Sequence, residues 1–180
     1  MQAPLNRGVS KMPSPLTCDE TSMHSRIRLT PLCPADAANL VRLYTDPVVR
    51  AYLGGPLSKE AAVKRAELEV GAHREAPLWV IRTQRAGQFA GVVSFDQHHD
   101  GVDIEVSYEL LPEHFGKGYA TEALTLALHY GKNVMGLRRV IAETQSRNLA
   151  SIRLLKRIGM TLERELTRFN EPQSIYAITW

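Results

Sequence analysis

The spacing of apolar residues predicts that short strands and helices succeed one another along this 180-residue chain. The segment 26–29 alternates polar and apolar residues, which predicts a first strand. Apolar residues then recur at helical spacing over 37–44, and Ser58, a residue type that caps helix starts, can begin a second helix. We therefore expect two helices, at about 37–44 and 58–74, after the first strand.

After Pro77 the spacing becomes that of strands. Segments 78–83 and 89–95 predict a hairpin, because a glycine-containing turn separates them. The clearest strand covers 102–110, where apolar residues alternate strictly with polar ones and Glu105 falls on the polar face. Such alternation predicts one buried face and one face open to water.

The last third of the chain mixes helical and strand spacing. Its predicted elements are a helix at 119–132, a buried strand at 140–144, a helix at 149–158 and a terminal strand at 174–180. Hairpins followed by alternating helices and strands predict an α/β fold with a mixed sheet in one domain. Residues 1–22 carry three prolines and no periodicity, so they predict an N-terminal extension to a domain over 23–180.

The composition is that of an ordinary folded protein, with 44% hydrophobic and 23% charged residues. It excludes wholesale disorder, collagen and coiled coil, and no apolar run approaches the ~20 residues of a membrane span. The net charge of +3 favours anionic ligands in general without indicating nucleic acid. Two cysteines without a CxxC motif, and a start without the apolar core of a secretory signal, predict a reduced, cytoplasmic protein.

The stretch 112–124, PEHFGKGYATEAL, carries the strongest chemical signal. Gly116 and Gly118 stand between a predicted strand and a predicted helix, and glycine lets backbone amides approach an anion closely. The unpaired amides and positive dipole end of the helix complete a cradle for phosphate oxygens. Such a turn is also common as a purely structural device. The stretch matches neither the ATP-binding P-loop nor the GxGxxG dinucleotide motif.

Two blocks of sequence resemble the GNAT family of N-acetyltransferases, closest to its ribosomal-protein alanine N-terminal acetyltransferase branch. The first block, 115–120, is similar to the family's acetyl-CoA loop Gln/Arg-x-x-Gly-x-Gly/Ala, except that Phe115 replaces the Gln/Arg donor. The second block, 148–160, is similar to the branch pattern of Asn-x-x-Ser, an apolar helix and then glycine. The resemblance covers about 25–180 and implies acetyl transfer from acetyl-CoA to a primary amine.

The resemblance also implies a mixed, mostly antiparallel sheet of roughly six to seven strands with about four helices. Its central parallel strands, one ending at Leu110 and one at 140–144, would splay apart and admit the pantetheine arm of acetyl-CoA. Contacts to this cosubstrate are implied for the strand end, the glycine turn and the start of the last helix. These residues are Tyr108, Glu109, Leu110, Gly116, Lys117, Gly118, Tyr119, Ala120, Thr121, Asn148 and Ser151.

The amine has to attack the thioester as a free base. Near pH 7 an α-amine costs about 1–1.4 kcal/mol to deprotonate and a lysine side chain about 4–5 kcal/mol. A protein N-terminal α-amine therefore needs only a mild base. Glu105 is the first candidate, because the resemblance implies a carboxylate at its strand position, and Glu143, shortly before Asn148, is the second. The alternative for each is an exposed strand carboxylate with no catalytic role.

The leaving thiolate needs a proton or a hydrogen bond. Many members of the family use a tyrosine seven residues after the asparagine, but here Leu155 occupies that position. Ser151 is the candidate that replaces it, with a hydrogen bond to its own helix backbone as the structural alternative. Backbone amides at the strand end would polarise the thioester carbonyl.

Other functions stay open from the sequence. The acceptor is alternatively a polyamine or an aminoglycoside, which would favour an acidic groove, or the chain is a catalytically silent acyl-CoA-binding module. Neither nucleic-acid binding nor membrane insertion is expected. No metal site is predicted, because His98-His99-Asp100 is typical of a solvated hairpin turn. An exposed edge of the terminal strand would suit a homodimer.

Overall fold

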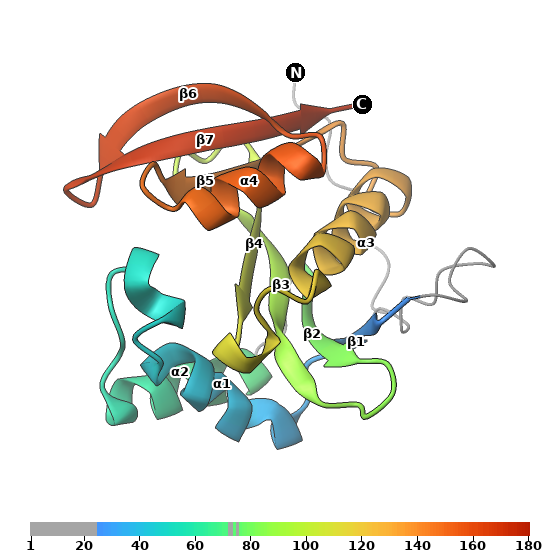
Figure 1. Ribbon diagram of the computed structural model, residues 1–180, viewed down its shortest axis with the longest axis vertical. Helices are drawn as coiled ribbons and strands as arrows, with labels where there is room; N and C mark the ends of the chain where they lie inside the picture. The colour runs from blue at the N-terminus through green and yellow to red at the C-terminus, as the bar shows by residue number, and fades with distance from the viewer. Residues whose placement is uncertain (1–24, 72–73, 75) are drawn as a thin grey trace.

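The computed structural model describes residues 25–71, 74 and 76–180, which form one sheet with helices packed against it (Figure 1). The predicted extension 1–22 lies outside the described residues. Seven strands pair in the order β1-β2-β3-β4-β5-β7-β6. Their bounds are β1 (Ile27–Pro31), β2 (Leu78–Thr83), β3 (Phe89–Gln97), β4 (Ile104–Leu110), β5 (Arg139–Gln145), β6 (Thr161–Arg168) and β7 (Glu171–Thr179).

All neighbouring strands pair antiparallel except β4 and β5, which are parallel. The predicted mixed, mostly antiparallel sheet is therefore confirmed. Four α-helices accompany it, again as predicted. They are α1 (Ala37–Thr45), α2 (Lys59–Gly71), α3 (Tyr119–Asn133) and α4 (Leu149–Arg157).

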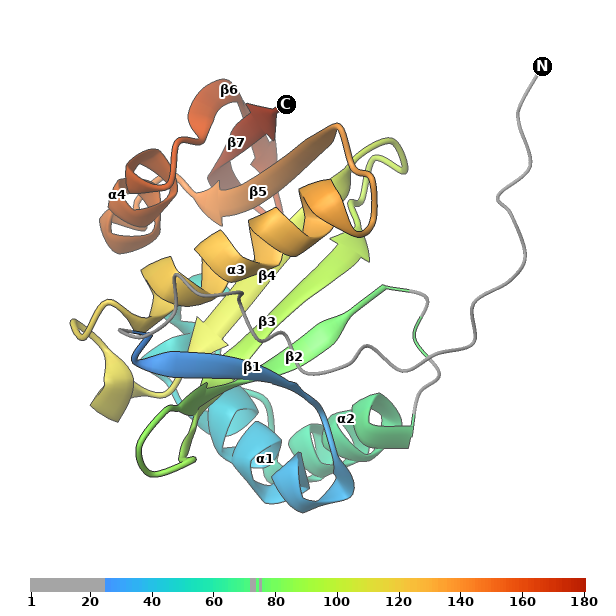
Figure 2. The same cartoon turned by 90° about the vertical axis from the view of Figure 1, so that its right-hand side faces the viewer.

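The helices divide between the two faces of the sheet. Neighbouring residues of β2 show this, because Trp79 and Ile81 belong to a core with α3, whereas Val80 belongs to a second core with α1 and α2. α3 runs beside β4 (Figure 2) and buries Leu124 and Ala127 completely. Burying a leucine side chain contributes about 1.5–3 kcal/mol, so the core that β4 shares with α3 through Val106 and Leu110 fixes the position of β4.

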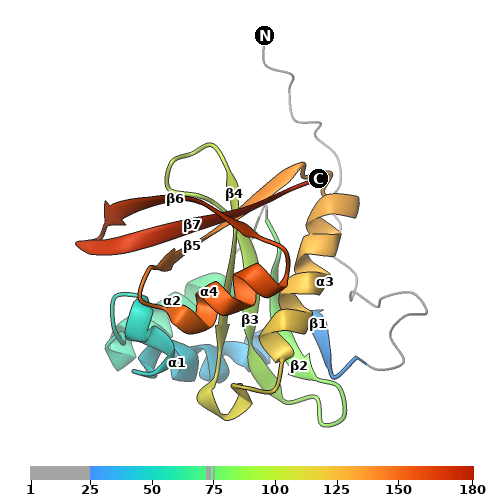
Figure 3. The same cartoon turned by 45° about the horizontal axis from the view of Figure 1, so that its top comes forward.

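β6 is the strand that the hydrophobic pattern does not predict. It is the outer edge of the sheet, beyond β7 (Figure 3), and its Leu162 is 49% exposed. Alternation of apolar residues cannot reveal a strand that buries so little of either face. Because β6 pairs with β7, the terminal strand has no free edge, and that expectation for a homodimer contact is wrong.

β4 departs from the prediction in two ways. It begins at Ile104, and Val102 is 81% exposed in the connection from β3. Its polar face is not simply open to water either, because Arg50 of the α1–α2 connection is 3.6 Å from Glu109. The carboxylates on this face are therefore half-buried, which changes their chemistry.

β4 and β5 pair only near their starts. Their register joins Glu105 to Ile141, and among the described residues no further pair follows. By contrast, β3 and β4 pair along the whole of β4. The two parallel strands thus diverge toward their carboxyl ends, next to the turn before α3 and the start of α4. This is the splayed centre that the resemblance implies.

Candidate active site

The turn between β4 and α3 forms a cradle of backbone amides. Gly116 and Gly118 have φ angles of +70° and +78°, a left-handed conformation that glycine adopts without strain. Gly118 is the N-cap of α3 and offers no side-chain cap, so the first amides of the helix stay available to a ligand. A Cβ built on Gly116 would meet nothing within 4 Å. The predicted segment 116–121 therefore has the room and the donors to hold a diphosphate.

A guanidinium that the sequence did not reveal stands beside this cradle. Arg26, just before β1, forms an ion pair with Glu122 in the first turn of α3. Its Nη2 atom would lie 2.6 Å from a Cβ added to Gly118. Arg26 brings a positive charge to a cradle in which Phe115 supplies none.

The start of α4 lies across the splay from β4. Asn148 caps the helix by accepting the backbone amide of Ser151 at 3.2 Å. The hydroxyl of Ser151 lies 2.7 Å from the hydroxyl of Tyr108 on β4. Burial raises the pKa of Tyr108 above its ordinary value, so its phenol is neutral near pH 7. The structure thus brings three predicted cosubstrate-binding residues together.

Glu105 points to the other side of β4 from Tyr108, because side chains alternate along a strand. Its Oε1 accepts the backbone amide of Glu143 at 3.2 Å, where β4 and β5 begin to diverge. Burial raises the pKa of Glu105, and that amide together with the nearby His98 offsets only part of the effect. No arginine or lysine in the described part of the chain pairs with this carboxylate. It can therefore take a proton from a ligand bound beside it.

Glu143 belongs to a buried network that the sequence did not predict. Its Oε2 accepts from His98 and from Arg168, each at 2.7 Å. His98 is 2% exposed and also contacts Asp100 at 2.9 Å. Burial opposes charge on the imidazole, yet hydrogen bonds to the two carboxylates raise the pKa of His98 overall. The expectation of a solvated turn is therefore wrong at His98.

Arginines also form ion pairs with the other carboxylates on the α1–α2 side of β4. Arg50, which is 8% exposed, lies 3.6 Å from Glu109. Glu69 of α2 accepts from Tyr44 at 2.7 Å and from Arg65 at 3.0 Å. These contacts balance most of the negative charge on this side of the sheet.

Four basic residues near the site were not predicted, and no short-range motif marks them. They are Arg26, Arg50, His98 and Arg168. Each meets a carboxylate at least 25 positions away along the chain. The shortest of these separations is that of Arg168 from Glu143, 25 residues. Such pairs depend on strand order, which spacing along the sequence does not encode.

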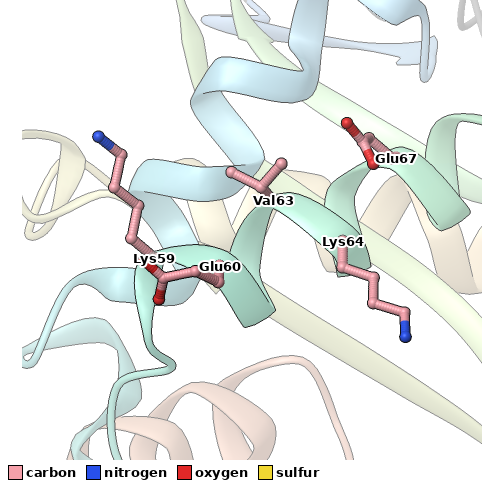
Figure 4. A pocket seen from close by; sticks show the side chains of 5 residues that line it. All are labelled: Lys59, Glu60, Val63, Lys64 and Glu67. Atoms are coloured by element: carbon pink, nitrogen blue, oxygen red, sulfur yellow. The ribbon is translucent and has the colours of Figure 1, made fainter.

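An open hollow on the outer side of α2 has no part in this site (Figure 4). Its lining comes from α2 alone, namely Lys59, Glu60, Val63, Lys64 and Glu67. Lysines and glutamates at this spacing are typical of a solvated helix face. Within residues 25–71, 74 and 76–180, no helix is long and apolar enough to cross a membrane. The same residues hold no group of three or more His, Cys, Asp or Glu side chains placed to bind a metal ion.

The sequence model of the acetyltransferase (GNAT) domain matches residues 26–161. The chain belongs to the GNAT acetyltransferase family. YkkB, an uncharacterized protein of Bacillus subtilis, is 30% identical to this GNAT chain over 158 residues, covering 84% of this chain and 91% of YkkB. The spermidine N(1)-acetyltransferase of Escherichia coli K12 is 32% identical over 81 residues, 44% of each chain.

Solved structures share the GNAT fold. A GNAT-family acetyltransferase from Bacillus anthracis has a TM-score of 0.75 at 25% identity, covering 86% of this chain and 95% of that one. Vibrio cholerae spermidine N-acetyltransferase, solved with CoA and spermine, has a TM-score of 0.73 at 17% identity, with coverages of 86% and 95%. Vibrio fischeri ribosomal-protein-S5-alanine acetyltransferase has a TM-score of 0.66 at 18% identity, with coverages of 86% and 93%.

At such low identities the two Vibrio likenesses show the fold alone. Membership of the family nevertheless identifies the reaction. This GNAT chain is an acetyl-CoA-dependent N-acetyltransferase, which transfers an acetyl group from acetyl-CoA to an amine.

Proposed function

We propose that this GNAT enzyme acetylates the α-amine of a protein or peptide N-terminus, with Glu105 as the general base. The observation that carries the proposal is the state of Glu105, a half-buried carboxylate that forms no ion pair with an arginine or lysine among the described residues. Burial raises the pKa of Glu105 toward that of its substrate, because an α-amine titrates at about 7.7–8.0. A base whose pKa approaches that of the amine accepts the proton of the amine efficiently.

The side of β4 that faces α3 and α4 supplies the binding groups for acetyl-CoA. The amides of 116–121 would hold the diphosphate. Beyond Glu105, β4 lacks its β5 partner, so the strand edge at Tyr108, Glu109 and Leu110 would pair with the pantetheine arm. Asn148 and Ser151, at the start of α4, flank the same gap. When bound, acetyl-CoA supplies the activated acetyl group.

Glu105 approaches the reaction from the other side of β4. It would accept a proton from the amine, directly or through one water, as the amine attacks. Glu143 is less suited to this role, because its Oε2 already accepts from His98 and Arg168. It holds Glu105 in place instead, through its backbone amide.

Most carboxylates near Glu105 already form ion pairs with arginines, which favours an acceptor with one amine over a polycation. A polyamine or an aminoglycoside carries several positive charges. It would need several free carboxylates around Glu105. Glu109, Glu69 and Glu143 each meet an arginine instead. A lysine side chain is also disfavoured, because its deprotonation near pH 7 costs roughly 3 kcal/mol more than that of an α-amine.

A polyamine is the second candidate acceptor. The sequence similarity to the spermidine N(1)-acetyltransferase of Escherichia coli supports it, over 44% of the chain. Spermidine would have to displace an arginine from Glu109 or Glu69, at a cost in affinity.

An acceptor panel distinguishes these candidates. Release of the CoA thiol would be followed with peptides of varied N-terminus, among them a ribosomal-protein sequence that begins with alanine, and with spermidine and an aminoglycoside. The control peptide has an acetylated N-terminus and an internal lysine. We expect kcat/KM for the best free N-terminus to exceed that for spermidine by about tenfold or more, the factor that about 1.4 kcal/mol gives. A higher kcat/KM for spermidine, or equal turnover of the blocked peptide, would contradict the proposal.

A further inference from the structure

The position where the family resemblance places a proton-donating tyrosine is occupied by an apolar side chain. Leu155 is fully buried, within the core that α3 and α4 share with the sheet. It has no proton to give. The departing sulfur therefore needs a donor from another element of the fold.

Tyr108 is the hydroxyl-bearing side chain that β4 itself presents to the splay. It lies three residues beyond Glu105, where the register between β4 and β5 has ended. Its ring packs against the core around α3 and α4, and its hydroxyl reaches Ser151 at 2.7 Å. The phenol is thus held at the gap from both sides, by packing at the ring and by a hydrogen bond at the oxygen.

We infer that Tyr108 donates the proton to the thiolate that leaves during acetyl transfer, and that Ser151 positions the phenol. The inference rests on the location of the site proposed above, though not on the identity of the acceptor. It assigns to the Tyr108 side chain a role that its strand position alone does not imply. Ser151, by contrast, acts through Tyr108 and is a positioning residue.

Proton donor and proton acceptor then stand on opposite sides of one strand. The amine nitrogen forms the new C–N bond, the C–S bond breaks and its electron pair moves to sulfur. Glu105 takes the proton that the amine loses, and Tyr108 gives its phenolic proton to sulfur. The hydroxyl of Ser151, 2.7 Å away, relays a proton from solvent to the phenolate, and Glu105 releases its proton to solvent. The products are an amide and a thiol, and no further reactant is needed.

The environment of Tyr108 keeps its phenol protonated before the reaction. Burial raises the pKa of its phenol, and only the hydrogen bond to Ser151 works in the opposite direction. The phenol therefore keeps its proton until a strong acceptor forms beside it. A hydrogen-bond donor aimed at developing charge in a partly buried site contributes about 10²–10³ in rate.

The test uses Tyr108→Phe, which removes only the hydroxyl, with Tyr130→Phe as the matched control. Tyr130 belongs to the same core but packs edge-on against Trp79. We expect Tyr108→Phe to lower kcat about 100-fold, with less than about a threefold change in KM for acetyl-CoA. Ser151→Ala should lower kcat about tenfold, and the double variant should be no slower than Tyr108→Phe alone, because the two residues act as one unit.

A second readout needs neither turnover nor acceptor. The ultraviolet absorbance of the thiolate reports the pKa of bound CoA, and a hydrogen bond from Tyr108 lowers that pKa. In Tyr108→Phe we expect the pKa of the bound thiol to rise by about one unit, a tenfold change in the equilibrium. In Tyr130→Phe it should stay as in the wild type. Melting curves would show that every variant is folded.

Two results would overturn the inference. The first is a Tyr108→Phe enzyme with near-normal kcat and an unshifted thiol pKa. The second is the reverse ranking, in which Ser151→Ala loses more than Tyr108→Phe, since Ser151 would then be the donor. A wrong acceptor assignment leaves the thiol titration intact, and a wrong cosubstrate site would appear as wild-type protein that fails to bind CoA. The failures are therefore distinguishable.

Discussion

The two sides of β4 are built from different kinds of groups. On the side of α3 and α4, backbone amides at 116–121 and the hydroxyls of Tyr108 and Ser151 line the splay. On the side of α1 and α2, carboxylates dominate, and all but Glu105 of those described above meet an arginine. Neutral donors suit a large anionic cosubstrate, whereas one unpaired carboxylate suits a single amine.

Under the proposed function, this difference lets one strand serve two substrates. Alternation of side chains sends Glu105 and Tyr108 to opposite sides, three residues apart. Because β4 diverges from β5, a gap opens between these two strands. A proton can then leave the amine on one side while the sulfur is protonated on the other.

Removing the unpaired carboxylate should give the largest effect. We expect Glu105→Gln to lower kcat by about 10²–10⁴-fold, the range that general-base catalysis contributes, while KM for acetyl-CoA changes little. Glutamine keeps the acceptor for the Glu143 amide. Steady-state kinetics of Glu105→Gln and of the control Glu69→Gln would check this. Equal losses in both variants would mean that the whole carboxylate face matters and that Glu105 has no special role.

The amide cradle should respond to a single methyl group. Gly116 and Gly136 have φ angles of +70° and +69°, and a Cβ added to either meets nothing within 4 Å. Alanine at either position therefore costs the same backbone strain, about 1–2 kcal/mol. Only Gly116→Ala puts its methyl group into the cradle, so we expect its Kd for CoA to rise about 10–100-fold. Calorimetry on both variants measures this, and parallel losses in the two would argue against a diphosphate at 116–121.

The His98 network should act on stability. The pKa of His98 is raised in the folded state, so its contribution is fully present below the unfolded value near 6.5 and is lost as pH rises through the folded value. We expect His98→Asn to cost about 1–3 kcal/mol at pH 6 and less at pH 9. The exposed neighbour His99 provides the control, as His99→Asn. Thermal melts across this pH range would test the slope, and a penalty independent of pH would show that His98 is neutral.

The smallest expected effect is a gain in the stability of the folded protein when Glu105 is replaced by glutamine. Burial raises the pKa of this carboxyl, so the folded state holds its proton to higher pH than the unfolded chain, and stability falls as pH rises through that window. Glu105→Gln removes this cost. We expect Tm at pH 8 to rise by about 2 °C, as is typical when an active-site charge is removed. Differential scanning calorimetry measures it, and a lower Tm would mean that the charge stabilises the fold.

The sequence predicted one side of β4 much better than the other. The glycines at 116 and 118, Asn148 and Ser151 lie in two short blocks, and the resemblance of these blocks to the family's motifs indicated the turn before α3 and the start of α4. Arg50, His98 and Arg168 meet their carboxylates through strand order and packing, which no short-range pattern encodes. β6 escaped prediction for a related reason, because an edge strand that buries little leaves no alternation in the sequence.

The division of labour across β4 is tested most directly by the pH dependence of kcat at saturating concentrations of both substrates. Under those conditions kcat reports the ionisation of groups in the bound complex. The wild-type enzyme should lose activity as pH falls through the raised pKa of Glu105. In Glu105→Gln this acidic limb should disappear and leave a low, flat profile. An acidic limb that persists unchanged in Glu105→Gln would show that another group takes the proton.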